Sequence, residues 1–156
     1  GCAVGRSIAC DIFELRLVLD TDVMVAAVRS DRGASRQILL GAVNGKVEIL
    51  VSVPLMIEYE AVLTRQEHLE ASGLRSEDVN EMLDALSVIA TPVYLRFLWR
   101  PQLTDPADEM VLETAVNGAA DVLVTFNLKH FGRSASVFGI RTLLPRDAWM
   151  ELRRTE

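Results

Sequence analysis

Acidic side chains that follow a predicted strand or open a predicted helix are the residues best suited to chemistry in this sequence. Asp20 and Asp22 follow the apolar run Arg16–Leu19, and Asp105 and Asp108 begin a predicted helix. In open parallel sheets, ligands bind beyond the carboxyl ends of the strands. Carboxylates gathered there repel one another unless a divalent cation neutralises them, and oxygen ligands favour Mg²⁺ or Mn²⁺. An ion held in this way can polarise a phosphodiester and activate a bound water.

Asp108 has the most informative position. At about 100° per residue, Val111 and Ala115 cluster around the direction in which Asp108 points. The carboxylate is therefore expected at the centre of the apolar face, where an unpaired charge is costly. A first-turn acid that reaches back to the N-cap is the simpler alternative. For Asp20 and Asp22 the corresponding alternative is that they merely cap the helix that follows.

Four glutamates are harder to assign. Glu58 and Glu60 lie on opposite borders of the apolar face of the helix that begins at Pro54, so periodicity does not choose between them. Glu109 lies near the border of the apolar face of the next acidic helix, and Glu113 lies outside it. We expect both of these to be solvent-exposed helix acids.

The elements that must position these residues alternate along the chain. Buried strands are predicted at Arg16–Asp20, Val47–Ser52, Val122–Thr125 and Ile140–Leu143, with an edge strand at Thr91–Tyr94 because Pro92 cannot donate to a ladder. Helices are predicted at 23–43 with a stop at Asn44–Gly45, at 54–66, from a cap at 76–78, at 105–117 and at 145–152, and a loop at 96–104. The alternation predicts an α/β fold, a three-layer α/β/α sandwich around a mostly parallel sheet.

Composition limits the remaining possibilities. The chain has 156 residues, 16 Lys+Arg against 22 Asp+Glu, a net charge of −6 and a pI of about 5.0. A hydrophobic content of 50% excludes disorder, and the length predicts one domain, which we place at 15–152 between an N-terminal arm or tag remnant (1–14) and a C-terminal tail (153–156). The acidic balance excludes a simple electrostatic clamp on nucleic acid, which needs surplus Lys and Arg.

The cysteines and the apolar segments indicate in which cellular compartment the protein is expected. Cys2 and Cys10 both lie near the N-terminus, and neither His68 nor His130 has a cysteine at ligand spacing, so no disulfide framework or zinc site is predicted. Every apolar run stops short of the ~20 residues that a membrane helix needs. We therefore expect a cytoplasmic protein without membrane contact.

Four sequence pieces, in this order and at these spacings, resemble the PIN domain family. They are Leu17–Asp22, Ser52 followed six residues later by Glu58, Asp105–Asp108 at the start of a helix, and Leu123–Asn127. The resemblance extends from Leu15 to about Met150. More narrowly, the chain is similar to the bacterial VapC-like group described as toxins of toxin–antitoxin pairs. The resemblance implies a PIN-like fold and a Mg²⁺- or Mn²⁺-dependent ribonuclease.

The resemblance also assigns roles to individual residues. Asp20, Glu58 and Asp108 match the three catalytic acids of the family, since the spacing from Ser52 fits Glu58 and not Glu60. We expect Asp20 and Asp108 to bind the metal directly and Glu58 to act as a ligand or as a base that orients the water.

Further positions are expected to support the metal site. The fourth family position, often Asp, is Asn127 here; it can hold a metal-bound water but brings no charge. Asp105 can supply that charge or simply cap its helix. Thr125 and Asp22 are expected to support the site, Thr125 through hydrogen bonds to the carboxylates.

Residues near the same edge of the predicted sheet suggest how the protein contacts RNA and other proteins. Basic residues after two of the predicted strands can form a phosphate-binding rim: Arg29, Arg32 and Arg36, then Lys129 and Arg133. Scattered surface arginines are the commoner explanation of such a pattern. His130, beside Phe131, is expected to be a packing residue that can also reach phosphate. The apolar loop around Trp99 is expected to cover the core or to meet a partner, and the family resemblance implies a homodimer and an antitoxin that blocks the site.

Two alternatives remain open from the sequence. Asp20-Thr21-Asp22 after an apolar strand also fits the nucleophile motif of haloacid-dehalogenase-type phosphatases, although Lys46 and Lys129 are poorly placed for that chemistry. Asn127 instead favours a degenerate PIN domain that binds RNA or protein without cleaving.

Overall fold

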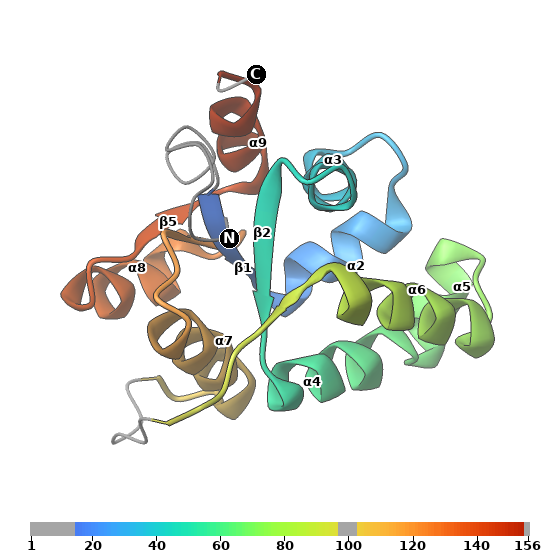
Figure 1. Cartoon of the computed structure of the whole chain (residues 1–156). Helices are drawn as coiled ribbons and strands as arrows, with labels where there is room; N and C mark the ends of the chain where they lie inside the picture. The colour runs from blue at the N-terminus through green and yellow to red at the C-terminus, as the bar shows by residue number, and fades with distance from the viewer. Residues whose placement is uncertain (1–14, 97–102, 155–156) are drawn as a thin grey trace.

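The computed structural model describes residues 15–96 and 103–154 and has a parallel sheet at its centre (Figure 1). Within the described residues the five strands lie in the order β3-β2-β1-β4-β5, and every pair is parallel. Leu17 in the central strand pairs with Ile49 on one side and with Val122 on the other. The strands are β1 (Leu15–Leu19), β2 (Val47–Val51), β3 (Thr91–Pro92), β4 (Val122–Val124) and β5 (Arg141–Leu143).

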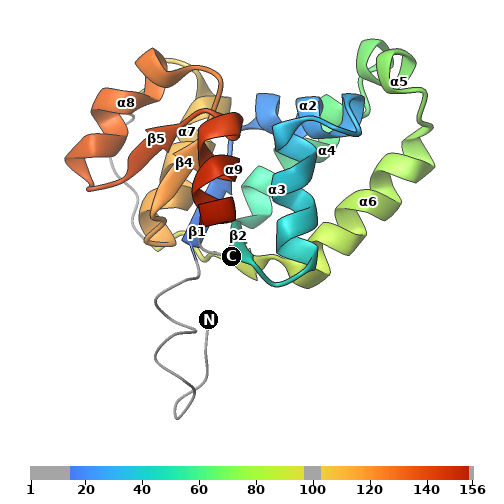
Figure 2. The same ribbon diagram turned by 90° about the horizontal axis from the view of Figure 1, so that it is seen from above.

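Helices cover both faces of the sheet. On one side lie α7 (Pro106–Asn117) and α8 (Leu128–Val137). On the other lie α2 (Thr21–Arg29), α3 (Ala34–Val43) and α9 (Pro145–Arg154). Figure 2 shows α4 (Val53–Leu63), α5 (Gln66–Ser72) and α6 (Ser76–Ile89) continuing away from the sheet on the side of α2 and α3. The predicted three-layer α/β/α sandwich with a parallel sheet is confirmed.

Burial of the central strands explains why the sequence forms this sheet. Leu17, Val18 and Leu19 are fully buried, and all five residues of β2 are buried. A strand covered on both faces by helices needs a continuous apolar run rather than alternation, as in Leu17–Leu19 and Ile49–Val51. Glu48, which is buried in β2, pairs with Arg16. Tyr59 and Phe131 are the largest fully buried side chains, and they anchor α4 and α8 to this core.

The predicted helix at 23–43 is wrong as a single helix. The chain leaves helical geometry at Ser30 and re-enters it after Gly33, so that α2 and α3 pack separately. The Arg36 Nε donates to the Ala27 carbonyl oxygen at 2.7 Å, which closes the turn between the two helices. The predicted stop after Val43 is confirmed, and Gly45 adopts a φ of 75° there, a conformation that favours glycine.

Other helices differ from the prediction in position or were not predicted. Helix α5 buries none of its residues and α8 buries only Phe131 and Ala135, and neither helix was predicted. The N-cap of α6 is Arg75, which moves Ser76 from a cap into the first turn, and α9 continues to Arg154. The predictions about residues 1–14 and about Trp99 concern parts of the chain outside the described residues.

The close approach of α7 to the sheet depends on a glycine at its end. A Cβ atom on Gly118 would lie 2.8 Å from the Val93 side chain and 2.9 Å from that of Leu50. The carbonyl oxygen of Gly118 also accepts a hydrogen bond of 2.7 Å from Arg16, which pairs with Glu48 at 3.0 Å. These contacts fix α7, and with it the acidic residues at its start. None of the described helices is both long and apolar enough to cross a membrane.

Candidate active site

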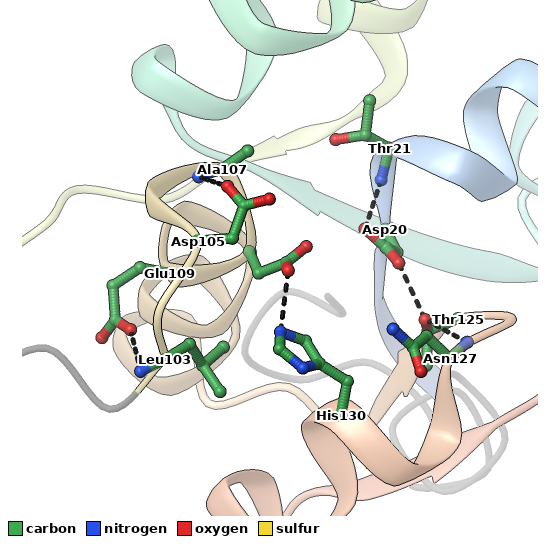
Figure 3. A network of polar contacts seen from close by, with 10 residues as sticks. Asp20, Thr21, Leu103, Asp105, Ala107, Glu109, Thr125, Asn127 and His130 are labelled. Atoms are coloured by element: carbon green, nitrogen blue, oxygen red, sulfur yellow. Dashed lines mark hydrogen bonds and ion pairs between the residues drawn. The ribbon is translucent and has the colours of Figure 1, made fainter.

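Asp20 lies at the centre of the site, where the chain leaves β1. Its backbone N–H donates to the Val124 carbonyl oxygen at 2.9 Å, so the ladder between β1 and β4 extends up to the carboxylate. The side chain caps α2 by accepting from the Thr21 N–H at 2.8 Å on Oδ1, and it accepts from Thr125 Oγ1 at 2.8 Å on Oδ2 (Figure 3). Both oxygens are therefore held, and the residue is only 4% exposed.

Burial makes the negative charge of Asp20 costly. The pKa of Asp20 is raised from 3.8 to about 6, chiefly by burial; the hydrogen bonds from Thr125 and Thr21 act to lower it, and the charges of Asp22 and Asp108 act to raise it. A nearby positive charge would stabilise the ionised form. Asp20 is thus a carboxylate whose surroundings favour a bound cation.

Asp108 faces Asp20 from the first turn of α7. It is half-buried, and burial followed by the charge of Asp105 raises its pKa. One carboxylate oxygen lies 2.8 Å from Nε2 of His130 on α8, the contact that the dashed line at the His130 ring marks in Figure 3. The ring N–H does not point along this line, so the contact is an ion-pair distance without a well-aligned hydrogen bond. His130 also packs edge-on against Phe131, with ring centroids 5.4 Å apart.

The packing expected for His130 is found, together with a polar contact that was not expected. Its ring does pack on Phe131, but its polar end meets Asp108. The position of His130 could have indicated this contact: His130 lies in the first turn of a helix that follows β4, at the edge of the sheet where α7 begins. That helix was not predicted, and so the contact was missed.

Two further acids add charge at the edge of the site. Asp105 caps α7 by accepting from the Ala107 N–H at 2.9 Å, with Pro106 at the first helical position. Its charge raises the pKa of Asp108, so the cap also acts on the site. Asp22 is exposed in the first turn of α2 and raises the pKa values of both Asp20 and Asp108.

Glu58 stands apart from these residues. It is half-buried on α4 and forms no hydrogen bond or ion pair with a described residue, whereas Glu60 is exposed. The neighbouring Tyr59 is fully buried and donates its hydroxyl hydrogen to the Leu19 carbonyl oxygen, which ties α4 to the end of β1. Ser52, at the start of α4, bonds to Thr114 of α7 at 2.7 Å. Helix α4 is thereby held at the same edge of the sheet, with Glu58 free of other partners.

The donors fit a hard divalent cation by their chemistry. Asp20 and Asp108 are carboxylates with raised pKa values that repel each other, and Asp105 and Asp22 add charge beside them. Among residues 15–96 and 103–154, however, no three acidic, histidine or cysteine side chains lie close enough to hold one ion. Asp20 and Asp108 are the two that could coordinate it first, and Glu58 would have to approach them.

Asn127 and the basic residues complete the rim. Asn127 is exposed at the N-cap of α8, where its N–H donates to Thr125 Oγ1 at 2.9 Å and its side chain makes no capping bond. Four basic side chains at this edge are exposed and form no ion pair with a described residue: Arg29, Arg32, Lys129 and Arg133. Arg36 differs, because it pairs with Asp31 at 3.3 Å.

The prediction that Glu109 is a solvent-exposed acid is wrong. Glu109 is 7% exposed and accepts a hydrogen bond of 2.8 Å from the Leu103 N–H. The Leu103 backbone therefore lies against the first turn of α7 and supplies a partner for the buried Glu109 carboxylate. Glu113, in contrast, is half-buried, and burial raises its pKa.

Comparisons with known proteins agree with this architecture. The family model described as PIN domain matches residues 16–129, which is most of the chain. A solved structure of similar fold is the crystal structure of VapBC2 from Rickettsia felis bound to a DNA fragment from their promoter. The similarity has 18% identity and a TM-score of 0.53, and it covers 82% of this chain and 97% of that one. No curated protein sequence matches the chain at a significant level. The family match displaces the haloacid dehalogenase alternative: this chain belongs to the PIN domain family.

Proposed function

We propose that this protein is a Mg²⁺- or Mn²⁺-dependent endoribonuclease and the toxin of a toxin–antitoxin pair. Membership of the PIN domain family implies nuclease activity in general. The observation that carries the specific proposal is the pair Asp20 and Asp108, two carboxylates from different elements whose pKa values are both raised. Carboxylates whose ionised form is disfavoured by burial and by neighbouring negative charges are suited to hold a divalent cation.

The chain's own residues have distinct roles in the proposed reaction. Asp20 is fixed at both oxygens by Thr21 and Thr125, so it needs no reorganisation to act as a ligand. Asp108 is oriented by His130. A cation bound between them would polarise the scissile phosphate and lower the pKa of the attacking water. Glu58, which has no partner among the described residues, would join as a ligand or accept the proton of that water.

RNA would approach along the exposed rim. Arg29 is the last residue of α2 and Arg32 lies in the connection to α3, whereas Lys129 and Arg133 lie on α8, so the four basic residues come from the segments that follow β1 and β4. Side chains without an ion-pair partner lose no internal contact when they bind phosphate. The metal and this rim together would let a chain of net charge −6 hold a polyanion.

An antitoxin and a second copy of the chain are the proposed protein partners. An apolar groove of about 360 Å³ between α3 and α6 supports a surface of this kind. Leu40, Val43 and Ile89 line it and are 44%, 62% and 38% exposed. Apolar side chains that gather on a surface in this way are typical of protein interfaces.

Cleavage of single-stranded RNA by the purified protein tests the proposal. The wild-type protein should cleave with Mn²⁺ and stop when EDTA removes the metal. Asp20→Asn should lose cleavage by several hundred-fold or more, because one direct ligand and its charge are gone. Undiminished cleavage by Asp20→Asn would contradict the assignment. Induced expression should arrest growth, and Asp20→Asn should not.

A second candidate function is a degenerate PIN domain that binds RNA or protein without cleaving it. Two observations favour it: the amide at Asn127, and the absence of a three-acid cluster among the described residues. Calorimetric titration with Mn²⁺ separates the candidates. Absence of Mn²⁺ binding together with absence of cleavage would favour the binding module.

A further inference from the structure

A second groove, of about 480 Å³, lies beside the carboxylates on the α3 and α9 side of the sheet. Its lining comes from the end of α2, the start of α3, the connection after β4 and the start of α9. The connection after β4 is shared with the carboxylate site: Thr125 bonds to Asp20, and the next residue, Phe126, lines the groove. The groove therefore begins one residue away from the hydrogen bond that fixes the central carboxylate.

Phe126 gives the groove an aromatic surface. Its side chain is 51% exposed between Thr125 and Asn127, although its neighbours Val124 and Thr125 are fully buried. Exposure of a large aromatic ring costs hydrophobic stabilisation that burial would provide. Aromatic side chains in this position are the platforms on which unpaired bases stack in proteins that bind single strands, largely independently of sequence.

The opposite wall of the groove offers donors for an anion. Gly33 is the N-cap of α3, and no side chain caps the first turn of this helix, so free backbone N–H groups lie where Gly33, Ala34 and Ser35 line the groove. Ser35 is only 4% exposed, and its hydroxyl has no hydrogen-bond partner among the described residues. Its oxygen is not one of the fully buried side-chain atoms that lack a partner, so the hydroxyl is open to the groove and can donate to a bound anion.

The charge of Arg146 and the small size of Gly33 also suit an anion at this position. The Arg146 side chain, 78% exposed at the start of α9, also lines the groove, and its contact with Asp147 is a long 3.9 Å. A Cβ atom on Gly33 would lie 3.2 Å from Ser30 Oγ, so a larger residue there would crowd the first turn of α3. The groove thus combines an aromatic ring, an uncapped helix start, a serine hydroxyl and a cationic side chain.

We propose that this groove binds one nucleotide of a single-stranded RNA, next to the nucleotide that is cleaved. The base stacks on Phe126, and the phosphate accepts hydrogen bonds from the first turn of α3, Ser35 and Arg146. This subsite rests on the proposed function for its substrate class. It is separate from the carboxylates, because none of its residues is a ligand in the proposed metal site.

Fluorescence anisotropy with a short fluorescein-labelled single-stranded RNA tests the subsite in EDTA, where cleavage is absent. Phe126→Ala should weaken binding about ten-fold, the size expected for loss of one stacked base. Phe126→Leu keeps an apolar side chain of similar size and should weaken binding about as much, because it also removes the ring. Arg146→Gln and Ser35→Ala should each weaken binding about three-fold. Phe138→Ala is the matched control, since Phe138 is a 42% exposed aromatic residue at the opposite edge of the sheet, and it should leave affinity unchanged.

Cleavage with Mn²⁺ separates failure of the subsite from failure of the proposed function. Phe126→Ala should raise KM for RNA about ten-fold and change kcat little. Unchanged affinity and unchanged KM in both Phe126→Ala and Arg146→Gln would overturn the subsite, even if the wild-type protein cleaves RNA. So would an absence of RNA binding by the wild-type protein, or tighter binding of single-stranded DNA of the same sequence. If the wild-type protein fails to cleave but Phe126→Ala still weakens RNA binding, the subsite stands and the nuclease proposal fails.

Discussion

The Thr125 hydroxyl donates a hydrogen bond of 2.8 Å to Oδ2 of Asp20 and joins the ends of two strands that lie 105 positions apart in the sequence. The same hydroxyl oxygen accepts from the Asn127 N–H at 2.9 Å. Thr125 therefore sets the position of the central carboxylate and the start of α8 at once. Its hydrogen bond also lowers the pKa of Asp20, against the stronger effect of burial.

Replacing Thr125 tests this relationship. Thr125→Val keeps the shape but removes the donor, so the pKa of Asp20 should rise further. The acid limb of the pH profile for RNA cleavage should then move up by about one pH unit. Thr125→Ser keeps the hydroxyl and should restore the wild-type profile. Thr142→Val, on the neighbouring strand β5, is the control; an equal shift in that variant would remove Thr125 from this role.

Asp20→Asn should stabilise the metal-free fold while it abolishes cleavage. The pKa of Asp20 is raised to about 6, so ionisation of this residue near neutral pH opposes folding. Removing the charge should raise the free energy of unfolding by about 2 kcal/mol at about pH 7. Urea unfolding in EDTA measures this change. Asp84→Asn, at an exposed position of α6, should leave stability within error, and a loss of stability in Asp20→Asn would contradict the argument.

The raised pKa of Asp20 also predicts how the free energy of unfolding depends on pH. The folded-state pKa of Asp20 lies above its unfolded value of 3.8, so the folded protein binds more protons between 3.8 and about 6. The contribution of Asp20 to the free energy of unfolding should fall as pH rises through this range, and stay low above it. A bound cation should offset the destabilisation caused by ionised Asp20. Mn²⁺ should therefore raise Tm more near pH 7 than near pH 5. Asp20→Asn should show a smaller fall with pH, and an equal fall would argue against Asp20 as its source.

His130→Ala should weaken the binding of Mn²⁺ by about ten-fold. His130 lies 2.8 Å from Asp108 and limits the directions in which that carboxylate can point. Loss of a residue that orients a metal ligand typically costs this much in affinity. Isothermal titration calorimetry measures the change, and His68→Ala, a histidine on α5, provides the control. Stronger Mn²⁺ binding by His130→Ala would instead show that His130 competes with the metal for Asp108.

Glu58→Gln and Glu60→Gln form a matched pair. They lie two residues apart on α4, and each removes one charge without changing the size of the side chain. Glu58→Gln should reduce kcat for RNA cleavage at least about a hundred-fold, because Glu58 is the proposed ligand or base. Glu60→Gln should leave kcat unchanged. Equal effects in both variants would remove the distinction between the two glutamates.

The strands and the fold class could be predicted from the sequence because their signals are local. Buried parallel strands such as Leu17–Leu19 need continuous apolar runs, and the alternation of strands with helices leads to a parallel sheet. Helices with few buried residues gave no such signal: α5 buries none and α8 only two. The break between α2 and α3 was also missed, since the Arg36 contact that closes it is tertiary.

For the site, the sequence by itself determined which carboxylates stand at the ends of elements, and so identified Asp20 and Asp108 as candidates. A hydrogen bond from Thr125 to the carboxylates was expected from the sequence and is present, whereas the other partners were decided only by the tertiary structure. The bond from Thr125 to Asp20, the contact between His130 and Asp108, and the burial of Glu109 each join elements that are distant in sequence or fold back in space. Local periodicity records which face of an element is apolar. The partner of a polar group depends on the packing of other elements against it, and that is a property of the whole fold.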